Sequence, residues 1–313
     1  MVVWLLAGLG LLILLLAGDA LVKGAVNMSL RLGVPALIVS LTIVAFGTSA
    51  PELLIAIEAI SDHAPGLALG NVVGSNTANI LLVLGVPALL ATLHTSECNT
   101  RKTYNMMIMA TLLFIGLAFR GVFDWTSGLI LLAALAYVLF DAFRDALAHK
   151  NACKDDEEVE GADPDMRWWK IGVFLVLGLI GLPLGADLLV DNSTIIARTY
   201  GVSDTVIGLT LVAIGTSLPE LATTVMAALR RQADVALGNV IGSNMFNLLA
   251  IIGIATMVGP IRVDPAFLRF DLWVMLAASI MLIPFVYLRQ DITRKWGIGL
   301  TSLYLIYLLV VLT

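Results

Sequence analysis

Residues 41–85 read LTIVAFGTSAPELLIAIEAISDHAPGLALGNVVGSNTANILLVLG, and residues 209–253 read LTLVAIGTSLPELATTVMAALRRQADVALGNVIGSNMFNLLAIIG. The two copies align without a gap at an offset of 168, and 22 of the 45 positions are identical. The identities cluster in Gly-Thr-Ser-x-Pro-Glu and Gly-Asn-x-x-Gly-Ser-Asn-x-x-Asn, which are unusual inside apolar segments. The match extends upstream, where Asp19 aligns with Asp187 and Gly33 with Gly201. The chain is therefore an internal duplication.

The composition indicates an integral membrane protein. The chain has 313 residues, of which 59% are hydrophobic and 13% charged, with a mean hydropathy of +0.97. A soluble domain has about a quarter charged residues. We therefore expect the lipid bilayer as the main partner, with no nucleic acid and no obligate protein partner. Cys98 and Cys153 lie in polar connections and suggest neither a disulfide framework nor a metal cluster.

The hydropathy pattern predicts an all-α integral membrane fold with ten transmembrane helices, arranged as two inverted five-helix repeats. A bilayer core needs roughly 20 apolar residues per helix. The predicted spans are about 2–29, 34–60, 66–92, 103–119, 126–144, 169–198, 204–229, 235–258, 270–288 and 297–313.

The predicted domains follow from this count. They are a first repeat at 1–145, an acidic linker at 146–168 and a second repeat at 169–313. Because five is odd, the second repeat enters the membrane from the opposite side, as in many secondary transporters.

The basic residues predict the orientation. Thirteen Lys and Arg residues follow the odd-numbered spans, and four follow the even-numbered ones. By the positive-inside rule, the odd connections and the linker are cytoplasmic and both termini are external. The expected location is the cell (inner) membrane, crossed several times.

A proline interrupts each copy of the block. Pro51 and Pro219 lack an N–H donor and clash with the carbonyl four residues earlier, so each segment should kink or unwind near mid-span. Irregular backbone at that depth is tolerated where protein or a wet cavity satisfies it. The backbone carbonyls and hydroxyls that could then face a ligand belong to Ala45, Gly47, Thr48 and Ser49 and to Ala213, Gly215, Thr216 and Ser217.

Glu52 and Glu220 follow the two prolines. A carboxylate at mid-bilayer costs about 2.5–3.5 kcal/mol on insertion scales, and it usually marks an ion path. A structural buried ion pair is the alternative, but no Lys or Arg except Lys23 lies near the middle of a span. Two carboxylates without basic partners match the charge of one divalent cation.

The second half of each block predicts a helix with a polar stripe. Asn71, Ser75 and Asn79 are spaced by four residues, as are Asn239, Ser243 and Asn247, so each set shares one face. We expect Ser75, Asn79, Ser243 and Asn247 to be ligands. For Asn76 and Asn244, ligation and hydrogen bonding between helices both remain open.

The donors are carboxylate, hydroxyl, amide and carbonyl oxygens. Such a set suits hard cations such as Ca²⁺ or Na⁺ and not Zn²⁺ or Cu⁺. Ca²⁺ takes 6–8 oxygens in loose geometry, which two copies of the block could supply.

The paired Gly-Thr-Ser-x-Pro-Glu and Gly-Asn-x-x-Gly-Ser-Asn-x-x-Asn segments resemble the alpha-1 and alpha-2 repeats of the cation/calcium exchanger superfamily. Within it, the chain most resembles prokaryotic sodium/calcium exchangers. The resemblance implies antiport of Na⁺ against Ca²⁺ by alternating access, no enzymatic activity, and no cofactor beyond the transported ions. It also implies that the first and sixth helices slide across the rest.

The resemblance assigns a metal site. The matching positions are Glu52, Glu220, Thr48, Ser49, Thr216, Ser217, Ser75, Ser243, Asn79, and the carbonyls of Ala45 and Ala213. Asn247 departs from those exchangers that have Asp at this position, which leaves two formal charges in the predicted site.

Three other functions were considered. A H⁺/Ca²⁺ (or other divalent cation) antiporter is the main alternative, although such exchangers typically show Gly-Asn-Ala-x-Glu. An intramembrane aspartyl protease also needs two carboxylates, but its Tyr-Asp and Gly-x-Gly-Asp motifs are absent. A channel is the third alternative, and turnover that saturates and requires a counter-ion would exclude it.

Overall fold

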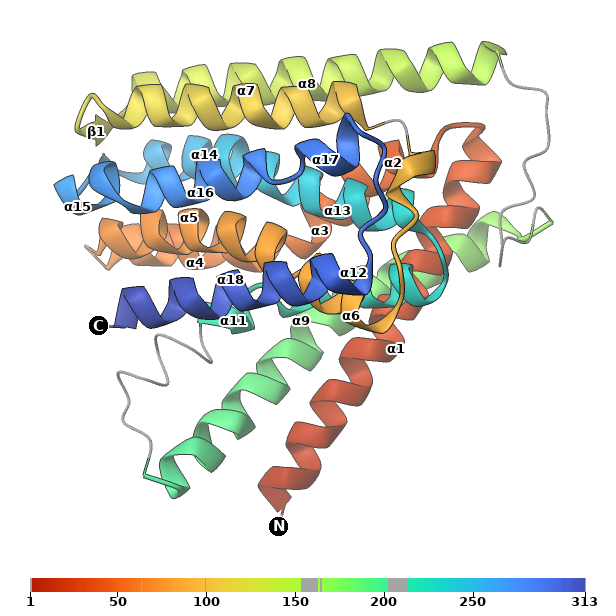
Figure 1. Cartoon of the computed structure of the whole chain (residues 1–313), viewed down its shortest axis with the longest axis horizontal. Coiled ribbons are helices and arrows are strands. Elements are labelled where there is room, and N and C mark those ends of the chain that lie inside the picture. Colours follow the sequence, from red (N-terminus) through yellow and green to blue (C-terminus); the bar gives the residue numbers. More distant parts are fainter. Residues whose placement is uncertain are drawn as a thin grey trace.

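The computed structural model describes residues 2–62, 64–98, 100–152, 163, 165–201 and 213–312. Within these ranges the chain is almost entirely helical, in agreement with the predicted all-α class (Figure 1). The exceptions are two short strands, β1 (Val122–Phe123) and β2 (Ile261–Arg262), which pair antiparallel and join the segment after α7 to the segment after α14.

The helices follow one another along the two halves of the chain. Those of the first half are α1 (Val2–Leu32), α2 (Ala36–Val39), the π-helical η1 (Ser40–Val44), α3 (Ala45–Thr48), α4 (Ala50–Ser61), α5 (Pro65–Leu81), α6 (Gly85–Leu90), the 3₁₀ turn η2 (Thr95–Glu97), α7 (Arg101–Ala118) and α8 (Trp125–Ala152). Those of the second half are α9 (Trp168–Thr199), α11 (Ala213–Gly215), α12 (Leu218–Leu229), α13 (Ala233–Met245), the π-helical η4 (Phe246–Ile251), α14 (Ile252–Val258), α15 (Pro265–Arg269), α16 (Asp271–Ile280), α17 (Ile283–Val286) and α18 (Arg294–Leu312).

Seven helices of the described ranges are long and apolar enough to cross a membrane, and the bent pair Ala36–Thr48 and Ala50–Ser61 makes an eighth. The predicted spans 103–119 and 204–229 are not among these eight. The helix α7 begins with two basic residues, and the predicted span 204–229 is described only from Ala213 onward. The layout of ten spans therefore stays a prediction at this point.

The first residues of the predicted linker are helical. Helix α8 continues to Ala152, into the segment predicted as the linker from residue 146 onward. Ala146, Leu147 and Ala148 extend the helical sequence past the apolar span, because helix propensity does not end where hydropathy falls. Most of the remaining linker, including Cys153, lies outside the described residues.

The repeated block lies at the centre of the molecule. Within an 18-residue apolar window of each span, the share that is buried in the protein is 83% for Pro65–Leu90 and 89% for Ala233–Val258. It is only 22% for Trp168–Thr199 and 17% for Arg294–Val311. The outer helices instead expose Leu, Ile, Val and Phe side chains over much of their length, as expected for surfaces that face lipid.

Helices α1 and α9 form an antiparallel pair that crosses the other helices at a steep angle (Figure 1). A Cβ on Gly10 would lie 2.6 Å from the backbone nitrogen of Leu189, and a Cβ on Gly178 would lie 2.5 Å from Cβ of Leu21. Gly178 and Leu189 are the positions 168 residues after Gly10 and Leu21. The two close contacts are thus the same contact made twice, with the repeats exchanged.

Candidate functional site

In each copy of the block the helix is interrupted, and a new helix begins directly after the interruption. Ser49 (φ −85°, ψ 3°) precedes α4, and Ser217 (φ −89°, ψ 2°) precedes α12, with a proline at the second position of each new helix. In the first copy the two halves meet at 41°. The predicted kink is therefore confirmed there, and the second copy has the same backbone conformation at its break.

Glu52 and Glu220 lie in the first turn of α4 and α12, at the centre of the protein. Their exposed fractions are 1% and 0%, and they are close enough to repel each other electrostatically. The N-terminus of a helix stabilises a negative charge through its dipole and its free N–H groups. The ion pairs found in the described part of the chain involve other residues.

Hydroxyl groups from both copies surround Glu220. Its Oε1 accepts hydrogen bonds from Ser49 Oγ at 3.4 Å and from Ser243 Oγ at 3.5 Å. Ser49 belongs to the first copy and Ser243 to the second. The structure thus brings the predicted hydroxyl ligands of one copy to the predicted carboxylate of the other.

Two further contacts cross between the copies and are equivalent to each other. Thr48 Oγ1 donates to Asn239 Oδ1 at 3.4 Å, and Thr216 Oγ1 donates to Asn71 Oδ1 at 3.4 Å. Asn239 also donates to the backbone oxygen of Glu220 at 3.3 Å. The sequence placed Asn71 and Asn239 on the polar stripes but did not identify this role, because the contact depends on how the two copies meet.

Five side-chain oxygens of the predicted ion ligands are buried without a hydrogen-bond partner in the protein. They are Glu52 Oε2, Glu220 Oε2, Ser217 Oγ, Asn79 Oδ1 and Asn247 Oδ1. Buried polar groups are normally hydrogen-bonded, so such a cluster requires an explanation. All five atoms can donate electron pairs to a cation, and the set fits a hard cation such as Ca²⁺ or Na⁺.

Asn76 and Asn244 join the two central helices. Asn76 Nδ2 donates to the backbone oxygen of Asn244, and Asn244 Nδ2 donates to that of Asn76, both at 3.4 Å. Asn244 Oδ1 also accepts from Asn79 Nδ2 at 3.1 Å, which leaves Asn79 Oδ1 unpaired. Of the two roles considered for Asn76 and Asn244, these contacts support helix-to-helix hydrogen bonding.

The remaining predicted ligands lie beside the breaks. Ser75 is 4% exposed on α5. The Ala45 carbonyl accepts from Ser49 N–H at 3.0 Å, so a cation would share this oxygen with that donor. Thr48 Oγ1 also lies 3.3 Å from it, but its single hydrogen can instead bond to Asn239 Oδ1. Ala213 is the first residue of α11, and its side chain lies outside the described atoms.

Two π-helical segments flank the site and were not predicted. η1 ends at Val44 and is separated from the first break by the short helix α3, and η4 begins at Phe246 and contains Asn247. Wide turns of this kind occur often at functional sites. The sequence gives little signal for them, because a π turn differs from an α turn only in its hydrogen-bond partner.

Close backbone approach places η1 and the start of α3 against α13. A Cβ on Gly242 would lie 2.6 Å from the carbonyl oxygen of Leu41 and 2.6 Å from Cβ of Ala45. Only glycine fits at this position, as expected for helices that associate through small residues. Among the described residues no group of three or more His, Cys, Asp or Glu side chains could hold a metal ion. The candidate site therefore depends on neutral oxygens together with two carboxylates.

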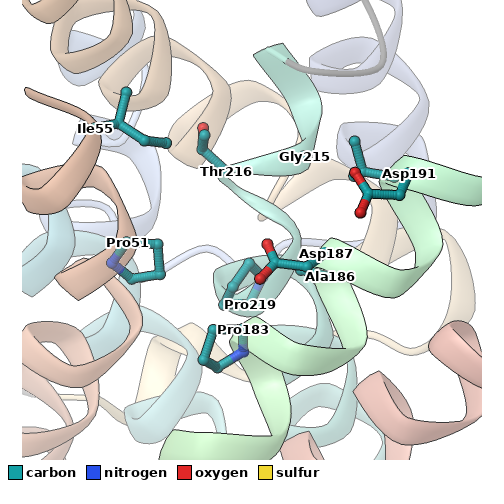
Figure 2. Close-up of a pocket in the computed structure, with 10 residues that line it drawn as sticks. Pro51, Ile55, Pro183, Ala186, Asp187, Asp191, Gly215, Thr216 and Pro219 are labelled. Carbon is teal, nitrogen blue, oxygen red and sulfur yellow. The ribbon is translucent and has the colours of Figure 1, made fainter. Parts of the chain in front are cut away.

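A cavity of about 130 Å³ reaches the two breaks from one side. Figure 2 shows Pro51 and Ile55 on one wall and Asp187 and Asp191 of α9 on the other, with Thr216 between them. Because Pro51 directly precedes Glu52 and Thr216 is a predicted ligand, the cavity lies beside the candidate site, on the side of α9.

The equivalent region of the other copy is closed. A Cβ on Gly18 of α1 would lie 3.0 Å from the carbonyl oxygen of Ala222 on α12. The position 168 residues after Gly18 is Ala186, which lines the cavity. The two copies thus differ in packing at equivalent places.

Comparison with known proteins gives a consistent result. The family model described as sodium/calcium exchanger protein matches residues 2–143 and 170–313. The putative antiporter CaxA of Alkalimonas amylolytica is 37% identical over 279 residues, which cover 88% of this chain and 86% of the relative. The sodium/calcium exchanger MaX1 of Methanosarcina acetivorans is 35% identical over 96% of each chain.

A solved structure has the same fold. The sodium-calcium exchanger NCX_Mj, soaked with 2.5 mM Na⁺ and 0.1 mM Ca²⁺, superimposes with a TM-score of 0.82 at 30% sequence identity. The match covers 98% of this chain and 97% of the other. The family, the relatives and the fold agree with the oxygen-lined centre: the chain is a multi-pass membrane protein that belongs to the sodium/calcium exchanger family.

Proposed function

We propose that the protein is a secondary active antiporter that exchanges Na⁺ for Ca²⁺ across the membrane by alternating access. The observation that supports this most strongly is the set of buried, unpaired oxygens that Glu52, Glu220 and neutral residues of the two repeated blocks contribute. Uncompensated carboxylates in a protein interior are costly, and a bound cation removes that cost.

The charge of the site suits one divalent ion. Glu52 and Glu220 supply two negative charges, and the amide and hydroxyl oxygens of Asn79, Asn247 and Ser217 complete a set of oxygen ligands. Two or more Na⁺ ions could occupy the same ligands with similar overall charge. Competition of this kind for one site is what an exchanger requires, because each ion then leaves as the other binds.

We propose the complete ligand set as Glu52, Glu220, Thr48, Ser49, Thr216, Ser217, Ser75, Asn79, Ser243, Asn247 and the carbonyls of Ala45 and Ala213. Supporting evidence comes from the cross-copy hydrogen bonds at Glu220 and at both threonines. These contacts gather oxygens from two segments that are 168 residues apart in the sequence.

The layout that we propose is ten spans in two inverted repeats, 1–145 and 169–313, with the linker 146–168 in the cytoplasm and both termini external. Repeated contacts with exchanged partners support a two-fold relation between the repeats. The antiparallel pair α1 and α9 is consistent with an axis in the membrane plane. Thirteen of the basic residues in the connections lie on the proposed cytoplasmic side.

Alternating access is supported by the difference between the repeats. The cavity lies between α9 and α4 beside the proposed site, whereas α1 packs closely on α12. If the repeats exchange these two arrangements, the site opens to the opposite side of the membrane. Transporters built from inverted repeats work in this way.

The alternative coupling ion is H⁺, and a flux assay distinguishes the two. Purified protein is reconstituted into vesicles, and ⁴⁵Ca²⁺ uptake is measured with an outward Na⁺ gradient at equal pH. A pH gradient in Na⁺-free buffer is the comparison. Uptake driven by Na⁺ alone supports the proposal, and uptake driven only by the pH gradient replaces it with the H⁺/Ca²⁺ antiporter.

A further inference from the structure

Three charged side chains connect α1 to the end of α12. Asp19 accepts a hydrogen bond from Arg230 Nε at 2.5 Å and forms an ion pair with Lys23 Nζ at 3.2 Å. The side chains of Asp19 and Arg230 are only 22% and 28% exposed, so water screens their attraction less than at an open surface. We call Asp19, Lys23 and Arg230 the ion-pair cluster.

The equivalent positions in the other repeat are all acidic. The residues at an offset of 168 from Asp19, Lys23 and Arg230 are Asp187, Asp191 and Asp62. An arrangement of one acid and two bases is thus replaced by three acids, which cannot form ion pairs with one another. We call these three residues the acidic set.

The packing of the two repeats differs in the same sense as their charges. Beside the ion-pair cluster, Gly18 of α1 packs closely against Ala222 of α12, where an added Cβ would lie 3.0 Å from the Ala222 carbonyl oxygen. At the acidic set, Asp187 and Asp191 line the cavity that separates α9 from Ile55 of α4 (Figure 2). The side with opposite charges is closed, and the side with like charges is open.

We infer that the ion-pair cluster holds the α1–α12 side of the ion site closed, and that mutual repulsion in the acidic set opposes closure of the α9–α4 side. This inference rests on the proposed alternating access. In the opposite state α1 leaves α12, which separates Arg230 from Asp19. Packing of α9 on α4 then brings like charges together. Both changes disfavour the opposite state, so the chain prefers the conformation described here.

The test uses two cysteine reporters in purified full-length protein that carries Cys98→Ser and Cys153→Ser. Ala186→Cys reports on the cavity, and Met226→Cys reports on the contact between α1 and α12, where Met226 lies 3.3 Å from a Cβ placed on Gly18. The rate of labelling by a charged thiol reagent is measured for each in detergent, at fixed Na⁺ and Ca²⁺. Elution as a single species in gel filtration verifies folding.

Arg230→Gln removes the ion pair. We expect labelling at Met226→Cys to increase about 10-fold, since a loss of about 1.4 kcal/mol shifts a two-state equilibrium by that factor. The charge exchange Asp19→Arg with Arg230→Asp should restore slow labelling, which a role limited to packing would not do. Arg269→Gln, on α15, is the control and should change neither rate.

The converse variant moves the ion-pair cluster to the other repeat. Asp62→Arg with Asp191→Lys recreates it around Asp187, and labelling at Ala186→Cys should fall about 10-fold as α9 closes on α4. If folded Arg230→Gln protein labels like the parent at both reporters, or if the charge exchange does not restore slow labelling, the inference is overturned. Labelling needs no transport, so these results stay separate from a failure of Na⁺-driven Ca²⁺ uptake, which would overturn the proposed function.

Discussion

At the scale of single residues, the ion site is defined by oxygens that the protein itself leaves unpaired. Glu220 Oε1 is hydrogen-bonded by two serines, whereas Oε2 of both Glu52 and Glu220 has no partner. The two serine hydroxyls thus orient the Glu220 carboxylate, and the Oε2 atoms of Glu52 and Glu220 stay available to an ion. A carboxylate placed in this way attracts a divalent ion more strongly than it does in water.

Replacing either central carboxylate should therefore abolish tight Ca²⁺ binding. Glu52→Gln and Glu220→Gln each remove one charge from a buried site, and we expect Ca²⁺ affinity to fall by about 100-fold or more, which is roughly 2.7 kcal/mol. Isothermal titration calorimetry of the purified protein measures this loss. Glu58→Gln is the matched control, because Glu58 lies exposed on the same helix and aligns with Met226. Unchanged affinity in Glu52→Gln would remove Glu52 from the site.

Much of the candidate site could be predicted at this scale. Glu52, Glu220 and the polar stripes stand out because charged and amide groups are costly inside apolar segments, and the duplication marks them twice. The contacts of Asn71 and Asn239 with the threonines of the opposite copy could not be predicted. They depend on the relative placement of two segments far apart in the chain, which periodicity does not encode.

At the scale of elements, the break in each repeated helix creates the site. With a proline at position 51, no N–H is available for the carbonyl of Gly47, and the helix bends by 41° at Ser49. The bend directs the first turn of α4, and with it Glu52, toward the centre. The sequence predicted this break from proline chemistry, but it did not predict the adjoining π turns.

Restoring the missing donor should weaken the site. Pro51→Ala supplies an N–H that can bond to Gly47, which straightens the helix and displaces Glu52. We expect at least about a tenfold loss of Ca²⁺ affinity by calorimetry, because a shift of about 1 Å in a ligand set is costly. The control is Pro65→Ala, since Pro65 begins α5, where a missing N–H costs little. Equal, small effects of both variants would show that the break is unimportant.

The start of α8 gives a prediction about pH. Hydrogen bonds from Thr126 Oγ1 and from the N–H and Oγ of Ser127, together with the charge of Arg120, hold the pKa of Asp124 well below its usual value of 3.8. A lowered pKa contributes stability that is fully present above 3.8 and is lost as the pH falls through the lower folded-state value.

Asp124→Ala should therefore lower the melting temperature by the same amount at pH 7 and pH 5, because Asp124 is ionised at both. The difference from the parent protein should shrink only below about pH 4. Thermal unfolding in detergent, followed by circular dichroism, measures it. A difference that already narrows between pH 7 and pH 5 would be inconsistent with this assignment.

At the scale of the whole molecule, two nearly equivalent repeats adopt different arrangements. Asn76 and Asn244 each donate to the other's backbone oxygen, whereas the cavity described above lies beside α9 and the equivalent part of α1 packs against α12. The duplication could be predicted from alignment and the all-α membrane class from hydropathy, whereas the layout of ten spans stays a prediction. Which repeat has the cavity could not be predicted. That depends on tertiary packing, which small sequence differences influence, such as Lys23 in the first repeat where the second repeat has Asp191.

The proposed topology makes a prediction about sidedness. A tag inserted in the linker near Glu160 should be protected from a membrane-impermeant protease in intact cells, and a tag after Thr313 should be cleaved. Permeabilised cells, in which both tags should be cleaved, provide the control. Two tags with the same accessibility in intact cells would require an even number of spans between them.

The central claim is that Glu52 and Glu220 form one site at which Na⁺ and Ca²⁺ compete. The most direct test is ⁴⁵Ca²⁺ uptake into reconstituted vesicles loaded with Na⁺, for the wild-type protein, Glu52→Gln, Glu220→Gln and Glu58→Gln. The account predicts uptake that saturates with Ca²⁺, disappears when the Na⁺ gradient is collapsed, is lost in both central variants and persists in Glu58→Gln. Na⁺-driven uptake at the wild-type rate in Glu52→Gln or Glu220→Gln would contradict it.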